Sequence, residues 1–359
     1  MNYKFLDVCN DVTKTATKIL QKDYLSTGKY PIFDQGKEYI GGYYNDDELA
    51  VFNYPYIIFG DHTRVVKYVD GPCYIGADGV KLLKVVNKNF LTKYVYYSMI
   101  ANPVVSQGYA RHFKLIKESF FKYTDINKQK YIINELDKIC CSIKNKQKLI
   151  LFQDELIKSR FIELFPEDGD FEHDNLSSIT TKITDGSHNP PKGVTFSEYI
   201  MASSQNVNDV LNLNDVRYLS KEDFDGENKR TDIQEGDVLF TIVGTIGRTY
   251  VIKSEKMVFQ RSVAVIKPKK NIINSIYLKY FLSSDFAAKQ IDIAAHGVAQ
   301  KGIYLSNLKE LDIIVPKIEV QDKFASFVES VDKLKFNVQK EIKDLQELLD
   351  KKMQEYFGE

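Results

Sequence analysis

Residues 127–164 and 320–359 each have the spacing of a long amphipathic helix, with apolar side chains every three or four positions and mostly polar ones between them. Neither stretch contains Gly or Pro before its end, at Pro166 and Gly358, where helices stop. A helix of about 38 residues is roughly 57 Å long, longer than the domain it leaves. Part of its apolar stripe therefore has nothing in its own half of the chain to bury against.

The simplest way to bury both stripes is to pack the two helices on each other. The mean apolar step is about 3.6 residues and predicts a nearly straight seam rather than a tightly wound zipper. The alternative is that each helix covers its own sheet. The residues predicted to form the seam are Ile132, Leu136, Ile139, Ile143, Ile150, Ile157, Phe161, Val331, Leu334, Val338, Ile342, Leu345 and Leu349.

An internal repeat places the same order of segments before each long helix. Val80–Lys84 aligns with Val263–Lys267, and the passage 107–126 before the first helix aligns with 296–316 before the second. A period this long indicates a duplicated domain rather than a solenoid. The predicted fold is α+β: two globular mixed α/β domains separated by two long helices packed as an antiparallel coiled coil, in a pseudo-twofold arrangement. The predicted segments are domain 1 (1–126), a central helix (127–164), domain 2 (165–319) and a C-terminal helix (320–359).

Composition is that of a folded protein with no general attraction for polyanions. The chain has 359 residues, 43% of them hydrophobic, and its 49 basic residues balance 49 acidic ones. Neither a signal peptide nor a membrane-spanning run is evident, so we expect a cytoplasmic protein. The four cysteines form no C-x-x-C pair and do not sit near histidines at ligand spacing, so we expect free thiols and no metal.

No motif predicts a catalytic site. Asn189-Pro190-Pro191 resembles the base-binding turn of adenine-N6 methyltransferases, but Lys192 follows where an aromatic ring should stack, and no methyl-donor loop is present. The segment from Gly244 to Arg248 lacks the spacing and the Lys of a P-loop. Three nearby acids lack the context of a nuclease motif and are interpreted as a solvated loop: Asp223, Asp225 and Glu227.

Several polar loops contain the side chains that read duplex DNA. Arg and Lys bind guanine edges, Asn and Gln bind adenine edges, and Ser, Thr, Lys and backbone amides hold phosphates. Taken singly, each is more often an ordinary surface residue, but such residues recur at matching places in the two copies. The candidate DNA contacts are Arg64, Arg111, His112, Ser187, His188, Asn189, Lys192, Gln205, Asn206, Arg248, Gln260, Arg261, Gln300 and Lys301.

These passages resemble the DNA-specificity subunit of a type I restriction-modification system. The resemblance is carried by DGSHNPP (185–191), GDVLFTIVGTIGR (236–248) and HGVAQKGIYLSNLKELDIIVP (296–316). The first domain departs from this pattern, with YIIFGDHTR (56–64) as a shortened Gly-containing strand and no DGSH-type segment. The resemblance implies two target-recognition domains, each followed by a spacer helix.

The resemblance also implies a function and partners. It implies a non-catalytic subunit that reads a bipartite double-stranded DNA site and directs two adenine-N6 methyltransferase subunits to it, with restriction subunits joining for cleavage. S-adenosylmethionine would be bound by the methyltransferase subunits, and this chain would hold no cofactor. The alternatives are an enzyme acting alone and a coiled-coil interaction scaffold without DNA specificity.

Overall fold

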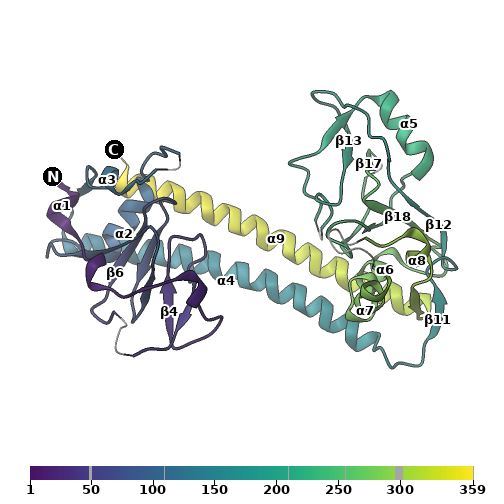
Figure 1. The fold of residues 1–359 in the computed structure, drawn as a ribbon, viewed down its shortest axis with the longest axis horizontal. Helices are drawn as coiled ribbons and strands as arrows, with labels where there is room; N and C mark the ends of the chain where they lie inside the picture. The colour runs from purple at the N-terminus through teal and green to yellow at the C-terminus, as the bar shows by residue number, and fades with distance from the viewer. Residues whose placement is uncertain (48–50, 109, 209, 255, 296–301, 359) are drawn as a thin grey trace. The chain divides into compact units, whose positions relative to one another are not determined.

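The chain divides into two compact units that each contain one end of both long helices. The computed structural model describes residues 1–47, 51–108, 110–208, 210–254, 256–295 and 302–358. Unit 1 comprises residues 1–148 with 338–359, and unit 2 comprises 149–337. The long helices are α4 (Ile126–Leu164) and α9 (Ile318–Phe357), and both therefore belong to both units (Figure 1). Because the units cut across both helices, the division into four consecutive segments stays a prediction.

Helices α4 and α9 pack against each other in an antiparallel sense within each unit. Side chains later on α4 meet side chains earlier on α9, which is the order that antiparallel pairing requires. The packing of the two helices on each other is therefore confirmed. From the start of α4 onward, the pairs are Glu135 with Lys352 and Lys146 with Glu341 in unit 1, then Asp154 with Lys335 and Phe161 with Phe324 in unit 2.

Most of the predicted seam is buried, with one clear exception. Leu334 is 56% exposed, and its prediction as a seam residue is wrong. Its neighbour Lys335 pairs with Asp154 instead, so the face of α9 that meets α4 contains position 335 and turns position 334 outward. Four predicted residues are half-buried, namely Ile150, Ile342, Leu345 and Leu349. The buried ones are Ile132, Leu136, Ile139, Ile143, Ile157, Phe161, Val331 and Val338.

Unit 1 contains a four-stranded antiparallel sheet, a mixed sheet and a separate strand pair. The antiparallel sheet has the order β2 (Cys9–Asp11), β9 (Val80–Val85), β6 (Tyr56–Gly60), β7 (Val66–Val69). The mixed sheet has the order β3 (Lys18–Ile19), β8 (Tyr74–Gly76), β4 (Tyr30–Phe33), β5 (Gly42–Tyr44). Strand β1 (Asn2–Lys4) pairs with β10 (Phe120–Lys122). The short helices are α1 (Phe5–Val8), α2 (Thr92–Ala101) and α3 (Phe113–Ile116), with 3-10 turns at Thr13–Thr15 and Gln21–Asp23.

Unit 2 is built from the same three kinds of element. Its antiparallel sheet has the order β12 (Thr180–Asp185), β18 (Val263–Pro268), β15 (Val238–Thr241), β16 (Thr249–Val251). A mixed sheet has the order β14 (Arg217–Leu219), β13 (Tyr199–Ala202), β17 (Met257–Phe259), and β11 (Glu172–Asn175) pairs with β19 (Asp312–Val315). The short helices are α5 (Lys221–Thr231), α6 (Ser275–Leu282), α7 (Asp285–Ala294) and α8 (Leu305–Lys309).

The two units share the order and direction of their matched strands, as the repeat predicts, and the mixed sheet of unit 1 has one further strand, β3. In each antiparallel sheet the aligned strand, β9 or β18, lies second in the order, and all neighbours are antiparallel. In each mixed sheet a strand pairs in parallel with one neighbour and antiparallel with the other: β4 with β8 and β5, and β13 with β17 and β14. In each unit an early strand also pairs with the exit strand that precedes a long helix.

Matching side chains dock each long helix on its sheet unit. Gln129 at the start of α4 and Gln321 at the start of α9 are both fully buried. The side chain of Gln129 accepts a hydrogen bond from Leu91 N (2.8 Å) and donates to Asn89 O and Thr124 O. Three further bonds of the same kind hold Gln321: it accepts from Asn274 N (2.8 Å) and donates to Ile272 O and Pro316 O.

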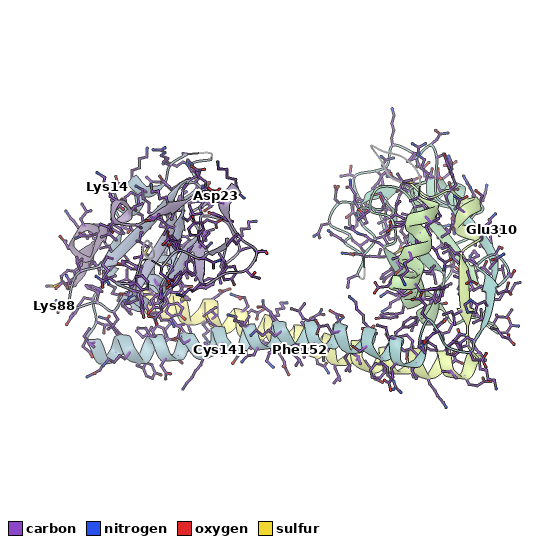
Figure 2. All side chains as sticks on the ribbon, turned by 60° about the horizontal axis from the view of Figure 1, so that its bottom comes forward. Lys14, Asp23, Lys88, Cys141, Phe152 and Glu310 are labelled. Atoms are coloured by element: carbon purple, nitrogen blue, oxygen red, sulfur yellow. The ribbon has the colours of Figure 1, made fainter. Side chains whose placement is uncertain are left out.

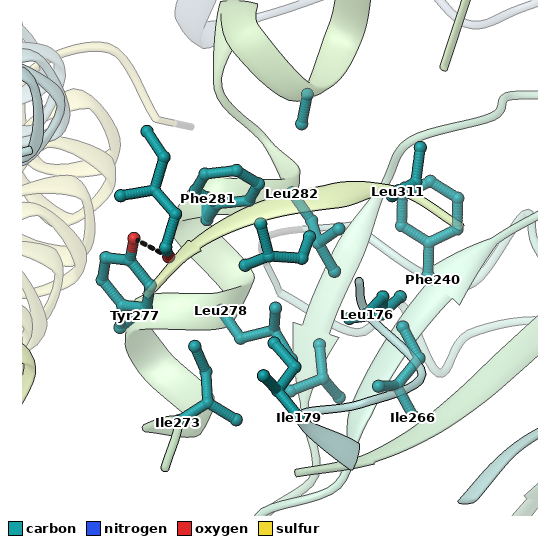
Figure 3. Close-up of a cluster of buried hydrophobic side chains, with 14 of the residues drawn as sticks. Leu176, Ile179, Phe240, Ile266, Ile273, Tyr277, Leu278, Phe281, Leu282 and Leu311 are labelled. Atoms are coloured by element: carbon teal, nitrogen blue, oxygen red, sulfur yellow. Dashed lines mark hydrogen bonds between the residues drawn. The ribbon is translucent and has the colours of Figure 1, made fainter. Parts of the chain in front are cut away.

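Aromatic side chains anchor the C-terminal end of each long helix. Phe165, just after α4, packs edge-on against Tyr277 in unit 2, with ring centroids 4.7 Å apart. Phe357, at the end of α9, packs against Tyr94 in unit 1 at 5.1 Å. The Tyr277 hydroxyl donates to Ile314 O (2.7 Å) within the core shown in Figure 3. Each helix thus begins in the core of one unit and ends in the core of the other.

Candidate DNA interface

The loops that carry most predicted contacts of unit 2 meet at one edge of its antiparallel sheet. Strands β12 and β15 both run antiparallel to β18, so the ends of β12 and β15 and the start of β18 share that edge. Backbone hydrogen bonds then join the loops to one another: Ser187 N donates to Phe259 O (2.7 Å), and Arg261 N donates to Ser187 O (2.8 Å). We call residues 186–189, 203–206, 242–248 and 259–262 the unit 2 loop cluster.

Two further contacts complete this cluster. Ser204 N donates to the Ser262 hydroxyl (3.1 Å), and Ile242 N donates to Ser262 O (2.9 Å). Ser262 therefore ties the loop after β13 and the loop after β15 to the start of β18. Gly302 forms a β-bridge with Val243, so the chain that begins at residue 302 lies at the same edge. Gln300 and Lys301 themselves lie outside the described residues.

Gly186 allows the loop after β12 to approach β17 closely. A Cβ atom at position 186 would lie 1.9 Å from Phe259 O, a distance that no side chain tolerates. Backbone atoms cannot move aside as a flexible side chain would. Only glycine at this position therefore leaves Ser187 and His188 where the structure has them.

A buried carboxylate links two exposed groups beside the cluster. Asp185, the last residue of β12, is 8% exposed. Its Oδ2 lies 2.8 Å from Nε2 of His188, and its Oδ1 accepts a hydrogen bond from the Arg230 guanidinium at the end of α5. The side chains of His188 and Arg230 are 50% and 51% exposed, so both face solvent while one buried group holds them.

The predicted contacts of unit 2 differ in accessibility. Asn206 is buried, and its amide is fully used: Oδ1 accepts from Ser203 N (2.8 Å), and Nδ2 donates to Asn212 O and Asp215 O. The prediction that Asn206 reads a base is therefore wrong, because it holds its own loop together. Ser187 is also buried, and it contributes backbone contacts.

The remaining unit 2 candidates stay predictions. Lys192 lies along β14, since its neighbour Pro191 accepts a hydrogen bond from Arg217 and Val194 bridges Tyr218. Within the cluster, Arg248 and Gln260 are half-buried. The exposed ones there are His188, Asn189, Gln205 and Arg261.

Unit 1 has an equivalent loop cluster at the matching edge of its sheet, which we define as residues 60–64, 76–79, 107–108 and 110–112. Gly60 at the end of β6 is paired with Val80 at the start of β9, and Asp61 N donates to Gly79 O (2.7 Å). His112 is fully buried: its Nδ1 lies 3.0 Å from Asp61 O, and its Nε2 accepts from Gln107 N (3.0 Å).

His112 therefore has no ring nitrogen left for DNA, and its prediction as a base contact is wrong. It holds the segment before α3 against Asp61, and the Asp61 carboxylate also accepts a hydrogen bond from Phe113 N (2.7 Å). Arg111 is exposed beside it. Arg64 is half-buried, and its backbone lies in the left-handed region (φ 62°). Its guanidinium donates a hydrogen bond to Val104 O (3.1 Å). Both arginines stay candidates.

The three acids in unit 2 belong to a helix rather than to the predicted loop. Helix α5 carries Asp223, Asp225 and Glu227, and its N-cap Ser220 accepts from Asp223 N (3.0 Å). Ser220 followed three residues later by an acid is a capping signal that predicts a helix start here.

Among the described residues no group of three His, Cys, Asp or Glu side chains could hold a metal ion, and the four cysteines are free. No helix in the described part of the chain is long and apolar enough to cross a membrane.

The fold and the loop clusters define a class of protein: two sheet units of one topology, each with polar side chains gathered at one sheet edge and each holding the ends of two long helices. Residues 176–347 match the family described as the type I restriction modification DNA specificity domain. The predicted resemblance to type I specificity subunits is thereby confirmed.

Other proteins show the same resemblance. The type I restriction enzyme EcoBI specificity subunit of Escherichia coli is 32% identical over 133 residues, which cover 37% of this chain and 28% of that protein. The crystal structure of a type I restriction-modification S subunit from M. genitalium has a TM-score of 0.61 at 14% identity, covering 100% of this chain and 96% of that one. A chain from a structure of type I restriction-modification complex assembly has a TM-score of 0.55 at 13% identity, covering 99% and 97%. At these identities the two structures support the fold alone.

Proposed function

We propose that the chain is the specificity subunit of a type I DNA methyltransferase or restriction complex and reads a bipartite site in double-stranded DNA. Each unit reads one half-site through its loop cluster. The observation that carries the proposal is that one topology occurs twice and presents different polar side chains at the same sheet edge. Two related readers with different side chains suit two half-sites of different sequence.

Exposed and half-buried side chains of the clusters have the chemistry for base reading. Arg261 and Gln260 in unit 2 and Arg111 in unit 1 offer the bidentate donors and acceptors that distinguish guanine and adenine edges in the major groove. Rigid loops favour such contacts because the choice of base depends on where the side-chain donors and acceptors lie relative to the base edge. In unit 2 the cross-loop hydrogen bonds of Ser187 and Ser262 provide that rigidity.

The chain acts, in this proposal, without catalysis of its own. Two methyltransferase subunits dock on it, bind S-adenosylmethionine and carry out the adenine-N6 methylation, and restriction subunits join the complex where DNA is cleaved. Equal numbers of basic and acidic residues support this division of labour, because phosphate affinity then comes largely from the partners. The isolated chain should bind DNA weakly, with a modest dependence on salt.

A scaffold without DNA specificity is the competing function, and one experiment separates the two. The purified chain is mixed with its methyltransferase subunits and genomic DNA, and the methylated adenines are mapped. The proposal predicts a gapped motif with two different half-sites. A single ungapped motif would rule out two readers, and methylation by the chain alone would overturn the non-catalytic role.

A further inference from the structure

We propose that Asp185 fixes the ring tautomer of His188, so that Nδ1 of His188 reads an exocyclic amino group, on adenine or cytosine, at one position of the unit 2 half-site. Asp185 is here a positioning residue, and His188 makes the contact. The inference rests on the proposed function. It goes further by naming the chemistry of one base contact and the buried group that determines it.

The geometry holds the histidine ring from one side only. Asp185 is anchored by its place at the end of β12, where it pairs with Ala264 of β18. Gly186 then allows the close turn, and Asp185 Oδ2 lies 2.8 Å from Nε2 of His188. Among the described residues Nδ1 of His188 has no hydrogen-bond partner, and the side chain is 50% exposed.

A carboxylate partner determines which nitrogen carries hydrogen. Ionised Asp185 can only accept hydrogen bonds, so Nε2 of His188 must donate to it. In a neutral imidazole the other nitrogen is then an acceptor. In the major groove, adenine N6 and cytosine N4 are donors, whereas guanine O6 and thymine O4 are acceptors. Nδ1 of His188 therefore favours an amino base over a keto base.

Arg230 makes the effect of replacing Asp185 predictable. The guanidinium has donors only, and it occupies Oδ1 of Asp185. In the variant Asp185→Asn the amide oxygen must stay with Arg230, so the amide NH2 faces His188. Nε2 of His188 then has to accept, and the hydrogen moves to Nδ1. The same ring, in nearly the same place, would present a donor to the base.

Two measurements test the inference on the full chain. Nitrogen-15 NMR of the histidine rings reports the tautomer without DNA, with His188→Gln identifying the signal. Methylated adenines are then mapped for the chain assembled with its methyltransferase subunits. Asp225→Asn is the matched control, since Asp225 is an acid on α5 that pairs with Lys221 on the surface.

In the wild-type chain we expect hydrogen on Nε2 of His188 and a gapped motif. In Asp185→Asn we expect hydrogen on Nδ1 and a preference that moves from an amino to a keto base, by about two- to tenfold, at one position. His188→Ala should relax the same position, and the unit 1 half-site should stay unchanged in every variant.

Other outcomes overturn the inference. One is a wild-type ring with hydrogen on Nδ1 or on both nitrogens. Another is a methylated motif in Asp185→Asn and His188→Ala that is identical to the wild-type motif. The third is an equal weakening of every position of the half-site in these variants. A wild-type complex that gives no gapped motif would instead contradict the proposed function, which the wild-type map alone decides.

Discussion

At the scale of single residues, several polar groups that look like surface contacts in the sequence hold the loops together instead. His112 and Asn206 are buried with their hydrogen-bonding groups used inside the chain. Their residue types suit base reading, so sequence patterns could not separate the two roles. The burial of these two side chains depends on how the segment before α3 and the loop after β13 pack on the rest of their units. Only tertiary contacts determine that packing.

Gly186 gives a prediction at this scale. Gly186→Ala should displace the loop that carries Ser187 and His188, because the added Cβ meets Phe259 O. We expect loss of sequence discrimination in one half-site only, measured by mapping methylation. Gly226→Ala is the control: a Cβ there meets nothing within 4 Å, and alanine should stabilise α5 by about 0.5–1 kcal/mol. Unchanged discrimination in Gly186→Ala would contradict the close approach.

The paired glutamines give a second prediction. Gln129→Leu leaves Leu91 N–H, Asn89 O and Thr124 O without their partner. Each unsatisfied buried group costs about 1–3 kcal/mol, so the free energy of unfolding of unit 1 should fall by at least about 2 kcal/mol. Hydrogen exchange resolved by segment would measure this loss.

The repeat supplies the controls for that measurement. Gln321→Leu should destabilise unit 2 by a similar amount and spare unit 1, because its three hydrogen bonds match those of Gln129. Gln346→Leu, at an exposed site on α9, should change the stability of either unit by no more than about 0.5 kcal/mol. Equal effects of all three changes would show that the buried bonds do not dock the helices.

At the scale of elements, apolar spacing predicts the two long helices but not the charged helix α5. Spacing over many turns predicts α4 and α9 to within a few residues, because errors at single positions average out. Leu334 shows the limit of this method. Its spacing places it in the seam, but the neighbouring Lys335 faces α4 instead and pairs with Asp154. Helix α5 has a charged composition and was missed, although Ser220 and Asp223 form a capping signal.

The seam therefore makes a contrast between two leucines. Leu136→Ala empties a fully buried position of α4 and should cost about 2–5 kcal/mol in the free energy of unfolding. Leu334→Ala removes an exposed side chain and should change that free energy by less than about 0.5 kcal/mol. Chemical denaturation of the two variants compares them directly. A larger loss in Leu334→Ala would mean that the seam runs along a different face of α9.

At the scale of the whole molecule, the proposed function has two separate tasks: the loop clusters would choose bases, and the long helices would set the gap between half-sites. The sequence indicated this division through its repeat and through the absence of a catalytic motif. Which bases are read could not be predicted, because hydrogen-bond readout depends on the placement of loops that the repeat does not share.

Lengthening both long helices tests this division. Seven residues inserted into α4 after Lys148 and into α9 after Asn337 add about 10 Å to each helix and keep the seam nearly in register. We expect the gap in the methylated motif to change by about three base pairs, with both half-site sequences unchanged. Altered half-sites at a constant gap would show that the helices do not act as spacers.

The most direct test of two separate readers changes one exposed arginine in each unit. Methylated adenines are mapped for complexes that contain Arg111→Ala or Arg261→Ala, each of which should lose about 1–3 kcal/mol of discrimination where the arginine contacts a base. We expect the two changes to relax different half-sites and to leave the gap unchanged. Relaxation of the same half-site by both changes would contradict the proposal of two separate readers.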